Sequence, residues 1–313
     1  MSRLHRQAEI PVILNPKARS ARAGERAQLI GNLSRRARVL ETRTEGDAHR
    51  LASELVAAGA PLIVVAGGDG TINKAVNGME RAGGLEAGTR LGILPSGTMN
   101  VFATELALPK NDLHACWEAI EHGSTREIDL WRANQHHFVQ LAGVGLDADI
   151  IEHTTWEMKR AFGPMSYVIA AARQMRQFRA PLVVRPEGFD PIAGTAVLFG
   201  NGRHYGGPFK IFPDASIDDH LIDIVVFRKH GYRELLKFLR AVAITGYGDS
   251  DSICYLQAPS VVVVSGAAAP VEVDGDLVDK TPVTVRRSRF PLRVAVPAPA
   301  AGDAAERLAA PGT

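Results

Sequence analysis

The sequence predicts an α/β domain with a mostly parallel sheet, followed by a domain of antiparallel strands. Short apolar runs alternate with helical stretches over roughly the first hundred residues. Continuous apolar runs such as residues 62–66 are typical of strands that are covered on both faces. From about Ile128 the chain changes to short strands separated by Gly, Pro and Asp. Because 313 residues are many for one hydrophobic core, we expect two domains.

In the first part, each strand is expected to lead into a helix, which gives a doubly wound, Rossmann-like arrangement. The strands are expected at Ile10–Leu14, Arg38–Thr42, Pro61–Ala66 and Arg90–Leu94, and the helices at Ala21–Leu33, Asp47–Ala58, Thr71–Met79 and Leu113–His122. Parallel strands end at one edge of the sheet, so the loops that follow them should gather there.

In the second part, shorter strands and two helical stretches are expected. The strands are expected at His137–Leu141, Leu182–Arg185, Ala196–Phe199, Leu221–Phe227, Ser260–Val264 and Val271–Val273, and the helices at Pro164–Phe178 and Tyr232–Ile244. The last stretch, Pro297–Thr313, is rich in Ala, Pro and Gly and is predicted to be disordered.

The run from Leu62 to Lys74 joins a buried strand to a helix through the turn Gly67-Gly68-Asp69-Gly70. Glycines let a polyanion approach the backbone, and Thr71 is expected to cap a helix whose N-terminus favours negative charge. The turn therefore indicates a phosphate site, although these four residues also suit a tight surface turn. A second glycine loop, Ser96-Gly97-Thr98, follows the next strand and should complete the same cleft.

Composition limits the function classes. The 36 basic and 34 acidic residues give a net charge of +2, which argues against a nucleic-acid partner. Cys116 and Cys254 are too few for a disulfide scaffold. No apolar stretch approaches the roughly 18 to 20 residues of a membrane-spanning helix, and the start lacks the apolar core of a signal peptide. We therefore expect a cytoplasmic protein.

Several motifs together, in their order and spacing, resemble the bacterial diacylglycerol kinase-like lipid kinase family, whose catalytic domain is shared with sphingosine kinases. The motifs are Asn15-Pro16, Gly67 to Asn73, Leu94 to Ala103, Ile128-Asp129-Leu130, Gly143 to Ala148, Gly163 to Tyr167, Pro213-Asp214-Ala215 with Asp218-Asp219, and Asp274-Gly275-Asp276. The resemblance implies a nucleotide-binding domain of NAD kinase/phosphofructokinase-like fold over residues 8–127 and a lipid-binding β-sandwich over 128–288. It also implies a final strand at 289–297 that returns to the first domain, a tail at 298–313, and an active site between the domains.

The resemblance further implies ATP and Mg²⁺ as cofactors and assigns the site. The ATP-contacting positions are Asn15, Thr44, Gly67, Gly68, Asp69, Gly70, Thr71, Ile72, Asn73 and Thr98. Asp69 organises Mg²⁺ or water around the phosphates, and Asp276 is the general base at a position where the family usually has glutamate. Without the resemblance, Val271 to Asp276 reads as a plain β-hairpin.

A structural magnesium site is implied at the Asp219 side chain and the main-chain carbonyls of Ser216 and Leu221. The family normally has glycine at the position of His220, which could close the φ angle that the turn needs. Asp129 and Lys159 match a charged network near the site, for which a surface ion pair is the alternative.

The expected function is ATP-dependent phosphorylation of a hydroxyl on a lipid such as diacylglycerol, presented at a membrane surface. The protein would then be peripheral at the inner face of the membrane, and homodimer formation stays open. One alternative is NAD kinase, because a Gly-Gly-Asp-Gly loop on a similar domain also serves that reaction. Another is a catalytically silent lipid- or nucleotide-binding regulator, suggested by Asp276 and His220.

Overall fold

The computed structural model describes residues 9–17, 37–145, 181–205, 209–229, 238 and 251–298. The chain divides into two compact units, one of which runs to Ile128 and resumes at Leu292, while the other spans Asp129–Pro291. Outside the described residues lie Lys159, the tail from residue 299, and the helices expected at Ala21–Leu33, Pro164–Phe178 and, apart from Phe238, Tyr232–Ile244.

The first unit contains a six-stranded sheet in the order β2-β1-β3-β4-β20-β5. Its strands are β1 (Ile10–Leu14), β2 (Ala37–Glu41), β3 (Leu62–Gly67), β4 (Arg90–Pro95), β5 (Ser124–Ile128) and β20 (Leu292–Val296). All pairs are parallel except β5 with β20. The inner strands β1, β3 and β4 are buried almost throughout, as expected for a sheet covered on both faces.

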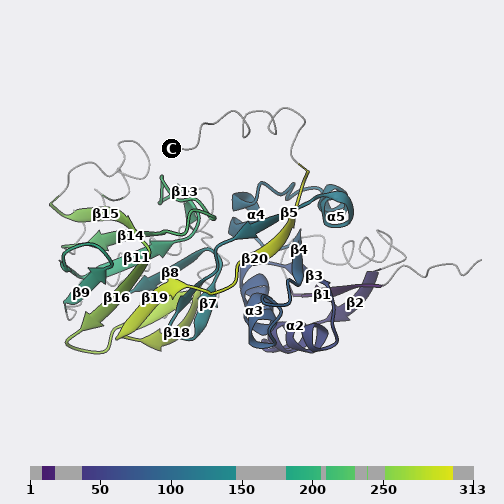
Figure 1. Ribbon diagram of the computed structural model, residues 1–313, viewed down its shortest axis with the longest axis horizontal. Coiled ribbons are helices and arrows are strands. Elements are labelled where there is room, and N and C mark those ends of the chain that lie inside the picture. The colour runs from purple at the N-terminus through teal and green to yellow at the C-terminus, as the bar shows by residue number, and fades with distance from the viewer. Residues whose placement is uncertain are drawn as a thin grey trace, which may run out of the picture. The chain divides into compact units, whose positions relative to one another are not determined.

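Helices cover this sheet on both sides, with α2 and α3 on one side and α5 on the other (Figure 1). The helices are α2 (Asp47–Ala57), α3 (Asp69–Arg81), α4 (Val101–Glu105) and α5 (Leu113–His122). The helices α2 and α3 pack closely, since a Cβ atom on Gly78 would lie 2.2 Å from the carbonyl oxygen of His49. The predicted doubly wound α/β architecture is confirmed.

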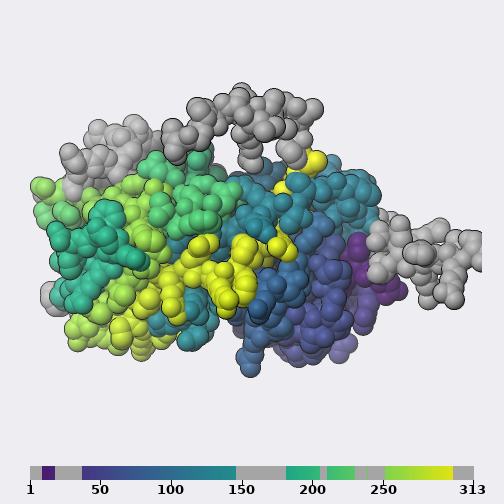
Figure 2. Space-filling model, in the orientation of Figure 1, coloured from purple at the N-terminus to yellow at the C-terminus, as the bar shows by residue number. Residues whose placement is uncertain are grey.

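The strand β20 lies inside the sheet although it follows the second unit in the sequence. It is hydrogen-bonded to β4 on one side and to β5 on the other. In the space-filling view its yellow atoms lie against blue and teal atoms of the first unit (Figure 2). The first unit is therefore assembled from two separate stretches of chain.

The second unit consists of two six-stranded antiparallel sheets, in the orders β10-β9-β16-β19-β6-β7 and β15-β14-β11-β8-β17-β18. The first sheet contains β6 (Trp131–Ala133), β7 (His136–Phe138), β9 (Leu182–Pro186), β10 (Ile192–Gly194), β16 (Ser260–Ser265) and β19 (Val283–Arg287). The second contains β8 (Leu141–Val144), β11 (Ala196–Gly200), β14 (Ile222–Phe227), β15 (Ile253–Ala258), β17 (Pro270–Val273) and β18 (Asp276–Lys280). A short pair, β12 (His204–Tyr205) and β13 (Phe209–Lys210), stands apart from both.

The two sheets share one apolar core, so the second unit is a β-sandwich, as predicted. Trp131 and Phe138 enter this core from one sheet, and Phe199 and Ile224 enter it from the other. A second apolar cluster lies on the opposite face of β11, β14 and β15. Its buried members are Leu198, Ile211, Phe212, Ala215, Val225, Phe238 and Ile253.

The strand predicted over His137–Leu141 is wrong, because β7 ends at Phe138 and β8 begins at Leu141. The Asp274 carboxylate accepts hydrogen bonds from the N–H groups of Val139, Gln140 and Leu141 at 2.8, 3.1 and 2.9 Å. A side-chain acceptor thus replaces the strand ladder at this point and interrupts the strand.

Candidate active site

The loop between β3 and α3 is shorter than expected. The helix begins at Asp69 and its N-cap is Gly68, whose carbonyl accepts from the N–H groups of Thr71 and Ile72 at 2.9 and 3.1 Å. The prediction that Thr71 caps the helix is therefore wrong. The Thr71 hydroxyl accepts a hydrogen bond from Asn15 Nδ2 at 2.9 Å instead, which links the end of β1 to the first turn of α3.

The two glycine loops meet at the same edge of the sheet, as the strand pattern predicts. Gly67 pairs with Pro95, and a Cβ atom on Gly97 would lie 2.6 Å from the Gly68 Cα atom. Asn100, at φ +48°, closes the second loop by accepting from the Gly97 N–H at 2.8 Å and donating to the Gly97 carbonyl at 2.9 Å. Glycine is therefore needed at 68 and 97 for contact between the loops themselves.

The Asp69 carboxylate accepts a hydrogen bond from the Phe102 N–H at 3.1 Å. Phe102 lies in the first turn of the short helix α4, where a negative charge is favourable. This is the one hydrogen bond of the Asp69 side chain among the described residues, so its second oxygen can serve a cation or its hydration water. The donor chemistry at Asp69 therefore fits Mg²⁺.

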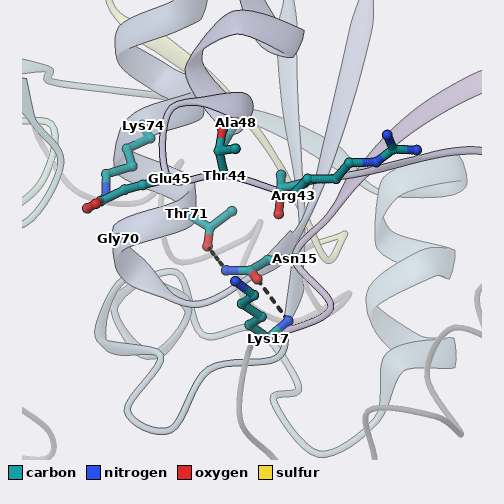
Figure 3. A pocket seen from close by; sticks show the side chains of 10 residues that line it. Asn15, Lys17, Arg43, Thr44, Glu45, Ala48, Gly70, Thr71 and Lys74 are labelled. Carbon is teal, nitrogen blue, oxygen red and sulfur yellow. Dashed lines mark hydrogen bonds and ion pairs between the residues drawn. The ribbon is translucent and has the colours of Figure 1, made fainter. Parts of the chain in front are cut away.

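A cavity of about 230 Å³ opens beside the first turns of α3 (Figure 3). It is lined by Asn15, Lys17, Thr42, Arg43, Thr44, Glu45, Ala48, Gly70, Thr71 and Lys74. Four of the predicted nucleotide-binding residues, Asn15, Thr44, Gly70 and Thr71, thus lie together. The others, Gly67, Gly68, Asp69, Ile72, Asn73 and Thr98, are not in its lining. Ile72 is fully buried and Thr98 is exposed.

The remaining lining residues were not predicted, although their positions carry a signal. Lys17 lies two residues after Asn15, and its N–H donates to Asn15 Oδ1 at 3.0 Å. Arg43 and Glu45 flank Thr44 in the loop after β2. Lys74 lies three residues after Thr71, on the same face of α3. The charged ones each lie within three positions of a predicted residue in the sequence.

The Thr44 loop is held by the first residue of α2. Asp47 Oδ2 accepts hydrogen bonds from the N–H groups of Arg43 and Thr44 at 2.8 and 2.9 Å. These bonds, together with Arg50, hold the pKa of Asp47 well below its ordinary value. Asp47 therefore stays ionised and fixes the main chain at one wall of the cavity.

The predicted β-hairpin at Asp274-Gly275 is confirmed. It joins β17 to β18, and Asp274 and Gly275 both have positive φ angles, of +46° and +91°. The Glu272 side chain is fully buried and accepts from the Gly275 N–H at 3.0 Å. Asp276 begins β18 and is half-buried. These bonds hold the hairpin at its turn and on β17, while β18 is the edge strand of its sheet.

The loop that was predicted to bind magnesium is closed by hydrogen bonds between its own residues. The Asp219 N–H donates to the Ser216 carbonyl at 3.4 Å, and Asp219 Oδ1 accepts from the Leu221 N–H at 3.0 Å. Partial desolvation raises the pKa of Asp219, and Asp129 and Asp218 add to the shift. A divalent cation would offset this negative charge, so the donor set fits Mg²⁺. In the described parts of the chain no three His, Cys, Asp or Glu side chains form a metal-binding group, so main-chain carbonyls would be required.

His220 adopts the glycine-like conformation of this loop, with φ at +69°. Its N–H and Nδ1 contact the two oxygens of the Asp129 carboxylate at 2.7 and 2.9 Å. Asp129 is almost fully buried, and Arg287 Nη1 lies 3.2 Å from its Oδ1. The hydrogen bonds to Asp129 compensate the backbone strain at His220. Arg287 is a member of this network that was not predicted.

A second anchor holds the start of the same loop. The Tyr255 hydroxyl accepts from the Asp214 N–H at 3.2 Å and donates to Asp223. Gln257 Nε2 donates to Asp223 Oδ2 at 3.2 Å and to the Asp214 carbonyl at 3.4 Å. Asp223 is fully buried, and this burial raises its pKa to about 6. The loop is therefore fixed at Asp214 as well as at Asp219 and His220.

Comparison with known families agrees with this architecture. Residues 9–133 match the family described as "Diacylglycerol kinase catalytic domain", and residues 140–297 match "YegS C-terminal NAD kinase beta sandwich-like domain". The chain therefore belongs to the diacylglycerol kinase-like lipid kinase family, which is a family of phosphotransferases.

Individual relatives cover most of the chain. A "Probable lipid kinase YegS-like" from Chromohalobacter salexigens is 31% identical over 277 residues, 85% of this chain and 86% of the relative. A "Diacylglycerol kinase" from Staphylococcus epidermidis is 30% identical over 240 residues, 76% of this chain and 74% of the relative. A solved structure of a "putative diacylglycerol kinase" from Bacillus anthracis has a TM-score of 0.76 at 25% identity, and the match covers 92% of this chain and 96% of that one.

In the described ranges, each helix is either too short or too polar to cross a lipid bilayer.

Proposed function

We propose that this chain transfers the γ-phosphate of ATP to a hydroxyl of a membrane lipid, with diacylglycerol as the leading acceptor. The observation that supports ATP use is the cavity of the first unit, where Asn15, Thr44, Gly70 and Thr71 lie beside three cationic side chains. The names of the relatives support a lipid acceptor. The acceptor is met at the surface of a membrane, to which the chain binds peripherally.

In this proposal residues 8–127 bind ATP, residues 128–288 bind the lipid, and residues 289–297 complete the ATP-binding domain. The open N-terminus of α3 and the nearby cations attract the phosphates, and the Asn15–Thr71 hydrogen bond holds that wall of the cavity. Asp69 directs Mg²⁺ or its hydration water. Mg²⁺ supplies charge neutralisation on the phosphate oxygens during transfer. The other predicted positions, Gly67, Gly68, Ile72, Asn73 and Thr98, act through the main chain or the shape of the loops.

Asp276 is the general base of the proposed reaction. It accepts the proton of the lipid hydroxyl as the hydroxyl oxygen bonds to the γ-phosphorus and the bond from that phosphorus to the leaving oxygen of ADP breaks. No covalent intermediate is needed. Aspartate is one methylene shorter than the glutamate usual in the family, so the backbone at Asp276 must approach the acceptor more closely. The hydrogen bonds at the turn restrain the hairpin that carries Asp276 and so favour that placement.

The loop of Ser216, Asp219 and Leu221 would hold a second, structural Mg²⁺ through one carboxylate and two carbonyls. Asp129, His220 and Arg287 fix the shape of this loop. Lys159 completes the charged network in this proposal.

Replacement of Asp276 by asparagine tests the proposal. Asp276→Asn should lower the turnover rate by at least about 10²-fold, because a general base typically contributes that much or more. The dissociation constant for MgATP, measured by calorimetry, should stay unchanged. Asp279→Asn, three residues along the same strand, is the matched control and should keep its activity. An active Asp276→Asn variant would remove Asp276 from the role of base.

The acceptor is tested with labelled ATP and separate preparations of diacylglycerol vesicles, a sphingoid base and NAD. Label in the diacylglycerol product supports the proposal. Label in NAD would favour NAD kinase, and MgATP binding without transfer to any acceptor would favour a silent regulator.

A further inference from the structure

One ion pair in the cavity joins two walls that are distant in sequence. Lys74 Nζ on α3 lies 2.7 Å from Glu45 Oε1 in the loop after β2, and both residues line the cavity (Figure 3). Lys74 stands one turn beyond Thr71, whose hydroxyl is bonded to Asn15. The Lys74 ammonium is therefore on the same face of α3 as the residues that form the cavity wall.

The two partners of this pair differ in exposure. The Glu45 side chain is 82% exposed and the Lys74 side chain is 27% exposed. An exposed carboxylate returns to water at little cost when its partner is taken by another anion, and a pair of this kind contributes little stability. Lys74 is the less exposed partner, so it would have to move further to reach solvent. Glu45 is thus the partner that can leave.

The charges around the cavity favour an anion with several negative charges. Among the described residues of its lining, Lys17, Arg43 and Lys74 are basic and Glu45 is the one acidic residue, and the Arg43 side chain extends away from Asn15 and Thr71 in Figure 3. The first turn of α3 adds the positive end of a helix dipole at Gly70 and Thr71. A polyphosphate carries more charge than one carboxylate and can also accept from main-chain N–H groups, so it should outcompete Glu45 for Lys74.

We propose that Lys74 is a phosphate-binding residue of the nucleotide site and that Glu45 is its resident counterion, displaced when the polyphosphate binds. This inference rests on the proposed use of ATP and adds a specific role for two residues outside the predicted set. The competing explanation is a purely structural brace between the loop after β2 and α3. The two explanations predict opposite effects for the removal of Glu45.

The test compares MgATP and adenosine binding by calorimetry at low ionic strength. Glu45→Gln removes the carboxylate charge next to Lys74 and should tighten MgATP binding by about 2- to 5-fold, the effect of removing an exposed pair. Lys74→Met should weaken MgATP binding by about 10-fold or more, since a charge-assisted contact is lost. Lys74→Arg keeps the charge and should stay close to wild type. Adenosine, which lacks phosphates, should bind all variants equally.

The matched control is Glu54→Gln, which removes an exposed carboxylate from the 2.8 Å pair with Arg50 on α2, outside the cavity lining. It should leave MgATP affinity unchanged. Weaker MgATP binding by both Glu45→Gln and Lys74→Met would overturn the inference in favour of a brace. An equal loss of adenosine affinity in Lys74→Met would overturn the assignment to phosphate. Failure of the wild type to bind MgATP would instead reject the proposed function, before any variant is compared.

Discussion

Two glycines of the site, Gly97 and Gly70, are glycine for different structural reasons. At Gly97 an added Cβ atom would meet the Gly68 Cα atom at 2.6 Å, and backbone cannot move aside as a flexible side chain can. At Gly70 an added Cβ atom would meet nothing within 4 Å, and Gly70 lies in helix α3. The first glycine serves packing between loops, and the second leaves room next to the cavity.

We therefore expect Gly97→Ala to destabilise the protein by about 1 to 3 kcal/mol through overpacking. Gly70→Ala should leave stability unchanged or raise it by up to about 1 kcal/mol, because alanine is the better helix former. Urea unfolding of both variants measures this difference. If Gly70 faces bound phosphate, Gly70→Ala should weaken MgATP binding in spite of its stability, and unchanged binding would contradict a role for Gly70 at the ligand.

His137 links stability to pH. It is buried on β7, with its Nε2 2.8 Å from Ser288 Oγ. Burial, with Arg132 and His136 nearby, lowers the pKa of His137 to about 4. A histidine whose pKa is depressed in the folded state stabilises the fold above its unfolded pKa of about 6.5, and this contribution is lost as the pH falls toward 4.

The expected loss from His137 is about 2 kcal/mol between pH 7 and pH 5. His137→Gln removes the titrating group and should make unfolding free energy less dependent on pH over this window. Urea denaturation of both proteins at the two pH values provides the measurement. Equal pH dependence in the two proteins would show that His137 is not responsible.

At the scale of elements, Asp69 serves two helices. It belongs to the first turn of α3 and accepts the Phe102 N–H at the start of α4. The helix α4 has five residues and its N-cap, Asn100, makes no side-chain cap bond. Asp69 is therefore the cap of α4 supplied from another element.

The cap and the proposed Mg²⁺ role of Asp69 can be separated. Asp69→Ala removes both and should cost about 1 kcal/mol of stability together with MgATP affinity and activity. Asp69→Asn keeps an oxygen acceptor for Phe102 and should retain most of the stability while MgATP binding weakens. Thermal unfolding and calorimetry on the two variants are compared with the wild type. Unchanged MgATP affinity in Asp69→Asn would leave only the cap.

The sequence predicts best those elements with a strong pattern of their own. The buried run Leu62–Gly67 and the amphipathic helix Leu113–His122 lie where expected, within a residue or two. The strands that were not predicted are those whose pairing partners lie far away in the sequence. β6 and β19 pair with each other across about 150 residues, and β15 alternates only weakly in burial. Such strands are defined by the sandwich they complete, and local sequence carries little of that information.

The candidate site was predictable to a similar degree. Glycine loops and Asn15 carry a recognisable sequence pattern, whereas Lys17 and Lys74 carry only the weaker signal of a charge two or three residues from a predicted position. Histidine at position 220 left the shape of this turn open, and the turn keeps its positive φ because the buried Asp129 carboxylate binds the main-chain N–H and the ring Nδ1 of His220. That compensation comes from a residue 91 positions away in sequence.

At the scale of the whole molecule, the second unit is an insertion between β5 and β20. The strand β20 fills an interior position of the first sheet and contributes the buried residues Leu292, Val294 and Ala295. A chain that ends at residue 291 lacks this strand and should leave β5 without a partner and one edge of β4 open. We expect it to be insoluble or to lack a cooperative thermal transition. A chain that ends at residue 298 retains every described strand and is the control. A stable, MgATP-binding protein ending at residue 291 would contradict this.

The interior place of β20 also matters during translation. The residues of β20 are synthesised only after the whole of Asp129–Pro291. The first sheet of the nascent chain therefore lacks one interior strand while the sandwich is synthesised. Stalled synthesis or early proteolysis anywhere in that insertion should therefore yield a first unit that does not fold by itself.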